Sequence, residues 1–316
     1  MKIVFLDADT VGDVPNLNSI EEFGDVTFYP TTKPGQAAER IRDADIVITN
    51  KVVLGKDLMK QAKELKLICV AATGMNNIDR EAAKELDIEV KNVAGYASQS
   101  VAQSTFAMIL QLVQNIPFYD DFVKSGEYSK SEIFTNVDRD FEEISGKRFG
   151  IIGLGNIGQK VAQIAEAFGA EVTYYSTSGK NTDQPYLLLG LEELLKTSDF
   201  ISIHAPLNEN TLGLISYDRI KLMKSSAILV NTGRGGIVNE QDLAKAIDEG
   251  LIRGAAIDVF ETEPIPDNHR LLKVKNRDRL VLTPHITWSS LEARMDLIEG
   301  IKMNIKEFLS RSEAQG

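Results

Sequence analysis

Cysteine is almost absent from this chain: Cys69 is the only one among 316 residues. A single thiol excludes an intramolecular disulfide and any metal site that needs several cysteines, and we expect no metal site. Cys69 lies in the apolar run LKLICVAAT, which predicts a buried strand. We therefore expect a reduced core residue without a chemical role.

Positive charge is also in short supply. The chain carries 35 Lys and Arg against 46 Asp and Glu, for a net charge of −11. Because binding to phosphate-rich surfaces needs a basic face, this balance disfavours nucleic acids and anionic membranes as partners. An anionic small molecule stays possible wherever a local cationic site exists.

Long hydrophobic runs are missing as well. No segment approaches the roughly 20 apolar residues that a membrane-spanning helix requires. The N-terminal run MKIVFL is short and is followed at once by Asp7 and Asp9, so we expect no secretory signal peptide. These features predict a soluble cytoplasmic protein.

What the chain does contain is an alternation of short apolar runs and amphipathic stretches. Near-continuous Val, Ile and Leu runs are typical of parallel strands covered on both faces. We predict strands at 2–7, 44–50, 65–73, 88–93, 148–153, 171–176, 199–205, 227–232, 254–260 and 279–284. The fold class that this alternation predicts is α/β, with two Rossmann-like or flavodoxin-like parallel-sheet domains and an active-site cleft between them.

Helices are expected between these strands. A long apolar helix begins at Ser98, and the last helix runs from Leu291 to about Ser310. The polar stretch 124–147 interrupts the alternation and predicts a surface arm.

One glycine-rich loop has the context of a phosphate site. Gly153-x-Gly155-x-x-Gly158 ends a hydrophobic strand and opens an amphipathic helix, with Asn156 and Ile157 in the turn. Glycines there allow a tight turn and close backbone approach, and the helix N-terminus favours a pyrophosphate. The loop therefore predicts a dinucleotide site.

The stretch YYSTSGK follows, where an NAD enzyme normally places an acidic residue on the ribose 2′-hydroxyl. This chain has Ser176, Thr177 and Ser178, with Lys180 close behind. Hydroxyls do not repel a 2′-phosphate as a carboxylate would, and Lys180 adds positive charge. The turn slightly favours NADP(H), while NAD(H) held through other contacts stays open because no arginine is present.

Three polar residues follow three successive strands: Arg234, Glu263 and His285. Reduction of a 2-keto acid needs an acid that titrates near neutral pH, and histidine does so. A neighbouring carboxylate favours and orients the protonated ring, and a guanidinium can hold the substrate carboxylate. Taken singly, each residue has a structural alternative. Of the other two histidines, we expect His204 to line the cofactor cleft and His269 to be exposed.

The chain resembles the D-isomer-specific 2-hydroxyacid dehydrogenases. The resemblance rests on VAATGMNNID, GKRFGIIGLGNIGQ, SDFISIHAPLNENT, LVNTGRGGIVNEQDL, AAIDVFETEP and LTPHITWSSLEAR, which span residues 70 to 295. It implies a discontinuous substrate domain (1–97 and 287–316), an inserted dinucleotide-binding domain (98–286), and a homodimer with contacts in 98–145.

The resemblance also implies roles for individual residues. His285 is the expected general acid/base, Glu263 its partner, and Arg234 the substrate-binding cation. Substrate binding is further expected at Thr73, Gly74, Met75, Asn50 and Trp288. Cofactor binding is expected at Gly153, Gly155, Asn156, Ile157, Gly158, Ser176, Thr177, Ser178, Lys180, His204, Ala205, Pro206, Thr211, Thr232, Gly233 and Asp258.

Within the family, AATGMNNID, SVAQSTFA and PHITWSS resemble the glycerate dehydrogenase/hydroxypyruvate reductase branch. This implies NAD(P)-dependent reduction of hydroxypyruvate or glyoxylate to D-glycerate or glycolate. Two alternatives stay open: a dehydrogenase for a bulkier 2-keto acid, and a dinucleotide-sensing protein like the corepressors that share this fold. Turnover with keto acids of different size separates these readings.

Overall fold

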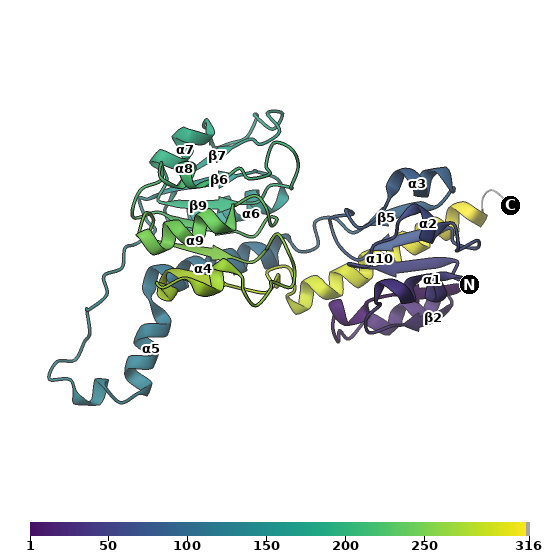
Figure 1. Ribbon diagram of the computed structural model, residues 1–316, viewed down its shortest axis with the longest axis horizontal. Coiled ribbons are helices and arrows are strands. Elements are labelled where there is room, and N and C mark those ends of the chain that lie inside the picture. Colours follow the sequence, from purple (N-terminus) through teal and green to yellow (C-terminus); the bar gives the residue numbers. More distant parts are fainter. Residues whose placement is uncertain (314–316) are drawn as a thin grey trace. The chain divides into compact units, whose positions relative to one another are not determined.

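The computed structural model describes residues 1–313 and divides into two compact units. Unit 1 comprises residues 1–97 and the segment from 289 onward, and unit 2 is the contiguous segment Ser98–Trp288 (Figure 1). The second boundary falls two residues after the predicted start at 287. Thr287 stays with unit 2 because its backbone N–H and its hydroxyl both donate to Asp258. Residues 314–316, which we predicted to belong to the substrate domain, lie outside the described residues.

Unit 1 is built on a parallel five-stranded sheet of order β2-β1-β3-β4-β5. Its strands are β1 (Lys2–Phe5), β2 (Asp25–Phe28), β3 (Ile46–Thr49), β4 (Leu67–Val70) and β5 (Glu89–Asn92). Its helices are η1 (Ala8–Thr10), η2 (Leu17–Phe23), η3 (Pro34–Gln36), α1 (Ala37–Ile41), α2 (Lys56–Met59), α3 (Arg80–Glu85) and α10 (Leu291–Glu313). Strand β2 was not predicted.

The C-terminal helix α10 completes unit 1. It packs against β4, β5 and η2 and buries Ala293, Leu297, Ile298, Ile301 and Ile305. A Cβ at Gly300 would overlap the side chain of Val93, so glycine permits the close approach of this helix to the end of β5. On β4, Cys69 is fully buried, and burial raises the pKa of its thiol to about 12. The prediction that Cys69 is a core residue is confirmed.

Unit 2 is built on a parallel seven-stranded sheet of order β12-β11-β10-β9-β6-β7-β8. Its strands are β6 (Arg148–Ile152), β7 (Glu171–Tyr175), β8 (Leu187–Leu188), β9 (Phe200–Ile203), β10 (Ile228–Asn231), β11 (Gly254–Ile257) and β12 (Leu280–Leu282). Its helices are α4 (Ser98–Gln114), α5 (Ile116–Lys124), η4 (Tyr128–Lys130), α6 (Asn156–Ala167), α7 (Leu191–Thr197), α8 (Tyr217–Ile220), α9 (Glu240–Glu249), η5 (Arg270–Lys273) and η6 (Arg277–Arg279). The predicted α/β class with two parallel sheets is confirmed.

The core of unit 2 explains the apolar runs. Strands β9, β10 and β11 are buried along their whole length, because α4 and α6 pack in one apolar cluster and α7, α8 and α9 in another. From unit 2 a segment projects that contains α5 and the irregular chain after it (Figure 1). The polar surface arm predicted at 124–147 is confirmed, although Ile133, Phe134, Val137 and Phe141 are exposed on it. Residues 1–313 contain no helix that combines the length and apolar character of a membrane span.

Candidate active site

Three neighbouring strands deliver the three predicted catalytic residues to one edge of the unit 2 sheet. β10, β11 and β12 pair in parallel, so their carboxyl ends lie at the same edge. Arg234 follows β10, Glu263 follows β11 and His285 follows β12. In open α/β sheets this edge is where ligands bind.

His285 and Glu263 form a direct pair. Nδ1 of His285 lies 2.8 Å from Oε2 of Glu263, and the other carboxylate oxygen, Oε1, accepts the backbone N–H of Phe260 at 3.0 Å. The two side chains keep 25% and 32% of their surface exposed, so the ring can meet a ligand from solvent. His285 also has a positive φ of 54°, an unfavourable backbone conformation for a residue with a Cβ.

Asp258 holds the loop that carries His285. Its fully buried carboxylate accepts the hydroxyls of Thr283 and Thr287, both at 2.6 Å, and the backbone N–H groups of Ile286 and Thr287. Its backbone carbonyl accepts the N–H of His285 at 2.8 Å. Asp258 was predicted to contact the cofactor. In the structure its carboxylate is occupied by this loop.

The turn that carries Arg234 is held by Asn231. The Asn231 side chain donates to the Arg234 carbonyl at 2.9 Å and accepts the N–H of Gly233 at 3.1 Å. The next residue, Gly235, lies so close to the Phe260–Glu261 peptide that any Cβ would overlap it. The Arg234 turn and the chain leading to Glu263 are therefore in backbone contact. Arg234 is half-buried, and its guanidinium donates a hydrogen bond to the carbonyl oxygen of Gly233 at 2.7 Å.

The glycine-rich loop has the geometry that a pyrophosphate requires. Gly153 has φ of 91°, and a Cβ there would meet the backbone of Ala205 at 3.0 Å. A Cβ at Gly158 would overlap the carbonyl oxygen of Gly153. Gly155, at the N-terminus of α6, faces open space, and Asn156 beside it is exposed while Ile157 is half-buried. The first N–H groups of α6 can therefore reach an anion.

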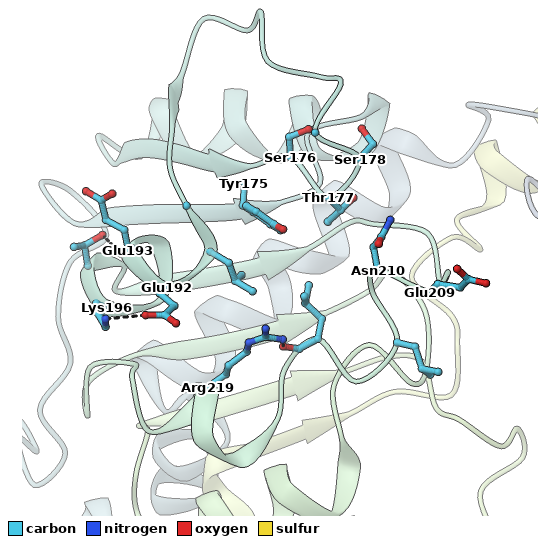
Figure 2. Close-up of a pocket in the computed structure, with 16 residues that line it drawn as sticks. Tyr175, Ser176, Thr177, Ser178, Glu192, Glu193, Lys196, Glu209, Asn210 and Arg219 are labelled. Carbon is cyan, nitrogen blue, oxygen red and sulfur yellow. Dashed lines mark hydrogen bonds and ion pairs between the residues drawn. The ribbon is translucent and has the colours of Figure 1, made fainter.

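The serine turn after β7 lines a pocket of about 1280 Å³. Figure 2 shows Ser176, Thr177 and Ser178 on one side of it, with Arg219 pointing in from α8 and the Glu192–Lys196 ion pair of α7 across from the turn. The Ser176 hydroxyl is buried and has no hydrogen-bond partner among the described residues. Lys180 was also predicted to bind the cofactor; it is exposed and is not among the residues that line this pocket.

A polar chain links β9 to β10. Oγ of Ser202 lies 2.8 Å from Nε2 of His204, whose Nδ1 lies 3.2 Å from Oγ1 of Thr232. Desolvation lowers the pKa of His204 to about 3, so the ring is neutral at physiological pH. After it, Ala205 is buried and Pro206 exposed, and the buried Thr211 hydroxyl donates to the Pro206 carbonyl at 2.7 Å.

The neutral His204 predicts a specific pH dependence of stability. Unfolding restores a pKa near 6.5, so below that pH the unfolded state binds the proton and the folded state loses stability until about pH 3. Between pH 7 and pH 5 this amounts to about 2 kcal/mol in the free energy of unfolding. Urea denaturation should show a smaller loss over this range for His204→Asn than for the wild type. Equal losses would contradict the assignment.

In unit 1, the predicted substrate-binding residues follow β3 and β4. Asn50 is buried after β3, and its backbone N–H donates to Oδ1 of the buried Asp7 at 2.9 Å. After β4, Thr73 is exposed while Gly74 and Met75 are half-buried. The Thr73 carbonyl accepts the Asn92 side chain at 2.6 Å. Trp288, the last residue of unit 2, is half-buried.

Sequence reasoning missed several residues that shape these loops. Asp7 accepts the backbone N–H groups of residues 50, 51 and 52, and Asn181 donates to the Leu154 carbonyl in the phosphate loop. His269 was predicted to be exposed, which is wrong: its side chain is 13% exposed and Nε2 lies 2.7 Å from Oε2 of Glu240. Among residues 1–313, no group of three or more His, Cys, Asp or Glu could hold a metal ion.

Comparison with known proteins decides the family. Residues 106–287 match the model of the D-isomer specific 2-hydroxyacid dehydrogenase, NAD binding domain, which is more than half of the chain. The chain belongs to the D-isomer-specific 2-hydroxyacid dehydrogenase family. It is therefore an oxidoreductase that acts on CH–OH groups with a nicotinamide dinucleotide.

Full-length relatives within the family support this assignment. The chain is 36% identical to a glycerate dehydrogenase of Methylorubrum extorquens, with 98% of this chain and 96% of that protein aligned. It is 35% identical to a hydroxypyruvate reductase of Blautia hydrogenotrophica, over 99% and 98% of the two chains. A solved acyclic imino acid reductase in complex with NADPH and D-Arg superposes with a TM-score of 0.87 at 30% identity, covering 98% of each chain.

Proposed function

We propose that this dehydrogenase reduces hydroxypyruvate or glyoxylate to D-glycerate or glycolate. The observation that carries the proposal is the His285–Glu263 pair, at the same sheet edge as Arg234. The names of the two relatives above, glycerate dehydrogenase and hydroxypyruvate reductase, support a small 2-keto acid as substrate.

The proposed chemistry assigns a separate task to each residue. The cofactor, when bound, supplies the hydride that reduces the carbonyl carbon. Arg234 holds the substrate carboxylate and polarises the carbonyl, whose oxygen gains negative charge as the reaction proceeds. Because Nδ1 of His285 faces Glu263, Nε2 is the nitrogen that gives its proton to that oxygen, and the Glu263 carboxylate stabilises the protonated ring.

We assign the substrate contacts of unit 1 on weaker grounds, from the family motif and from position. The backbone N–H groups of Thr73, Gly74 and Met75 follow a parallel strand and suit a carboxylate. We propose that Asn50, Met75 and Trp288 shape the substrate pocket. Unit 1 is then the substrate domain and unit 2 the dinucleotide-binding domain.

Initial rates with keto acids of different size test the substrate class. We expect kcat/KM for hydroxypyruvate to exceed that for phenylpyruvate by at least about tenfold, since a pocket for a small substrate excludes the phenyl ring. A preference for phenylpyruvate would establish the bulkier-substrate reading. Tight cofactor binding with no turnover of any keto acid would favour the dinucleotide sensor.

For the cofactor we propose NADPH as the preferred reductant, with NADH also used. Three features support it: no carboxylate ends β7, the Ser176 hydroxyl is unpartnered among the described residues, and the Arg219 guanidinium lines the same pocket. Glu192, Glu193 and Glu209 line it too, which opposes a second phosphate and limits the expected preference.

Ser176→Asp tests the cofactor assignment. A carboxylate at this position repels the 2′-phosphate and can bind the ribose 2′-hydroxyl, so the ratio of kcat/KM for NADPH to that for NADH should fall about tenfold or more. The ratio is measured with hydroxypyruvate at saturation. Lys63→Ala, an exposed lysine of unit 1 outside the pocket, is the control and should leave the ratio unchanged. An unchanged ratio in Ser176→Asp would remove Ser176 from the 2′-phosphate site.

We further propose a cytoplasmic homodimer. The exposed Ile133, Phe134, Val137 and Phe141 on the projecting segment support a contact with a second copy, because large apolar side chains that are exposed together favour protein association. Sedimentation equilibrium distinguishes this dimer from a monomer.

A further inference from the structure

We propose that Glu240 is a positioning residue for the catalytic pair: with His269 it fixes the Phe260–Glu261 peptide, and through it the Glu263 carboxylate that faces His285. The inference deepens the proposed function, since it takes Glu263 and His285 as the residues that handle the proton. Neither Glu240 nor His269 has a role in the chemistry proposed above.

Glu240 is an unusual acidic residue because it is buried. It is the first residue of α9, and 8% of its surface is exposed. Both carboxylate oxygens are used: Oε1 accepts the backbone N–H of Glu261 at 2.9 Å, and Oε2 lies 2.7 Å from Nε2 of His269. A buried carboxylate needs such partners, and its place in the first turn of α9 is electrostatically favourable.

His269 completes the contact in one tautomer. Its Nδ1 accepts the backbone N–H of Leu271 at 3.4 Å, so Nε2 carries the hydrogen that is donated to Glu240. The ring also packs edge-on against Phe260, with centroids 6.0 Å apart and an interplanar angle of 82°. His269 therefore orients the Glu240 carboxylate. Its ring also packs against Phe260, at one end of the peptide that Glu240 holds.

The Phe260–Glu261 peptide connects this contact to the catalytic pair. The N–H of this peptide donates a hydrogen bond to the Glu240 carboxylate. Gly235, in the turn that carries Arg234, lies against the same peptide with no space for a Cβ. The N–H of Phe260 donates to Oε1 of Glu263, whose Oε2 faces Nδ1 of His285. A shift of this peptide would therefore move the carboxylate away from the imidazole.

Few other charges surround the contact. The small cavity beside Glu240 and His269 is lined by Asn239, Gln241, Glu261, Thr262, Pro266 and Arg270. Of the charged groups, Arg270 is paired with Asp248 at 3.0 Å, and Glu261 is exposed. On α9 itself, Asp242 accepts the backbone N–H of Tyr217. Glu240 is thus the carboxylate that holds the Glu261 N–H.

The test follows the environment of the His285 ring directly, by NMR of histidine ring carbons in selectively labelled protein. With three histidines in the chain, each signal is assigned by substitution. We expect Glu240→Ala to shift the ring-carbon signals of His285, because the Glu263 carboxylate no longer lies against Nδ1 as it does in the wild type. The kcat for hydroxypyruvate should fall about tenfold, while the dissociation constant of NADPH stays within twofold of the wild-type value.

Matched variants distinguish positioning from loss of structure. Glu249→Ala removes a carboxylate from the other end of α9 and should leave the His285 signals at their wild-type positions. Glu240→Gln keeps an oxygen for the Glu261 N–H and should restore most of kcat. This variant also tests the proposal if the Glu240→Ala chain fails to fold. Wild-type His285 signals together with a wild-type kcat in folded Glu240→Ala would overturn the proposal. Because the NMR readout needs no turnover, lack of keto-acid reduction by the wild type would overturn only the substrate assignment.

Discussion

His285→Asn is expected to lower kcat for hydroxypyruvate reduction by about 10² to 10⁴ while the dissociation constant of NADPH stays within twofold. Asparagine can retain a hydrogen bond toward Glu263 but has no group that delivers a proton near neutral pH. The loss should therefore appear in the chemical step. Stopped-flow single turnovers give that step, and quenching of protein fluorescence gives cofactor affinity.

Glu263→Gln separates the proton donor from its partner. The amide can still accept the N–H of Phe260, but it no longer carries the charge that stabilises a protonated His285. Its expected loss is smaller, about tenfold to a hundredfold. If His285→Asn turned over at the wild-type rate, the assignment of the acid would be wrong and the pair at the end of β12 would be structural.

Arg234→Ala is expected to lower kcat/KM by about 10³, through both a higher KM and a lower kcat. The guanidinium is proposed to bind the substrate carboxylate and to stabilise charge on the carbonyl oxygen, and a single such donor is worth about 10² to 10³ in rate. Steady-state kinetics over a range of hydroxypyruvate concentrations separate the two parameters.

Arg234→Lys and Arg277→Ala are the matched variants for this prediction. Lysine keeps the charge but loses the planar fork, so it should recover only part of the loss. Arg277, in η6, is exposed, and its removal should have no effect. An unchanged KM in Arg234→Ala would remove the arginine from the substrate site.

The fold could be predicted where strands are buried, and less well at the sheet edges. Runs such as AILVNT are near-continuous in apolar residues because both faces of their strands are covered, and these strands were all found. The missed strands β2 and β8 are both at an edge of their sheets. β2 exposes every second residue and β8 has two residues, so neither produces an apolar run.

The candidate site shows a similar division. Residues directly after strands, such as Arg234 and His285, could be placed because parallel strands end at a common edge. Glu240 and His269 could not be paired, since they are far apart in the chain and a charged segment suggests exposure. Asp258 was predicted as a cofactor contact; its bonds to the Thr283–Thr287 loop were not predicted, because they depend on a return of the chain that no local sequence pattern indicates.

The position of α10 also dictates an order of events during biosynthesis. This helix covers β4 and β5 of unit 1, yet the whole of unit 2 is translated between β5 and α10. At about 10 residues per second, the ribosome takes on the order of twenty seconds over that interval. Until α10 is synthesised, the apolar surface of unit 1 that this helix covers stays exposed. Unit 2 is contiguous in the sequence and can fold first. A chaperone that binds apolar surface would meet the nascent chain during this interval.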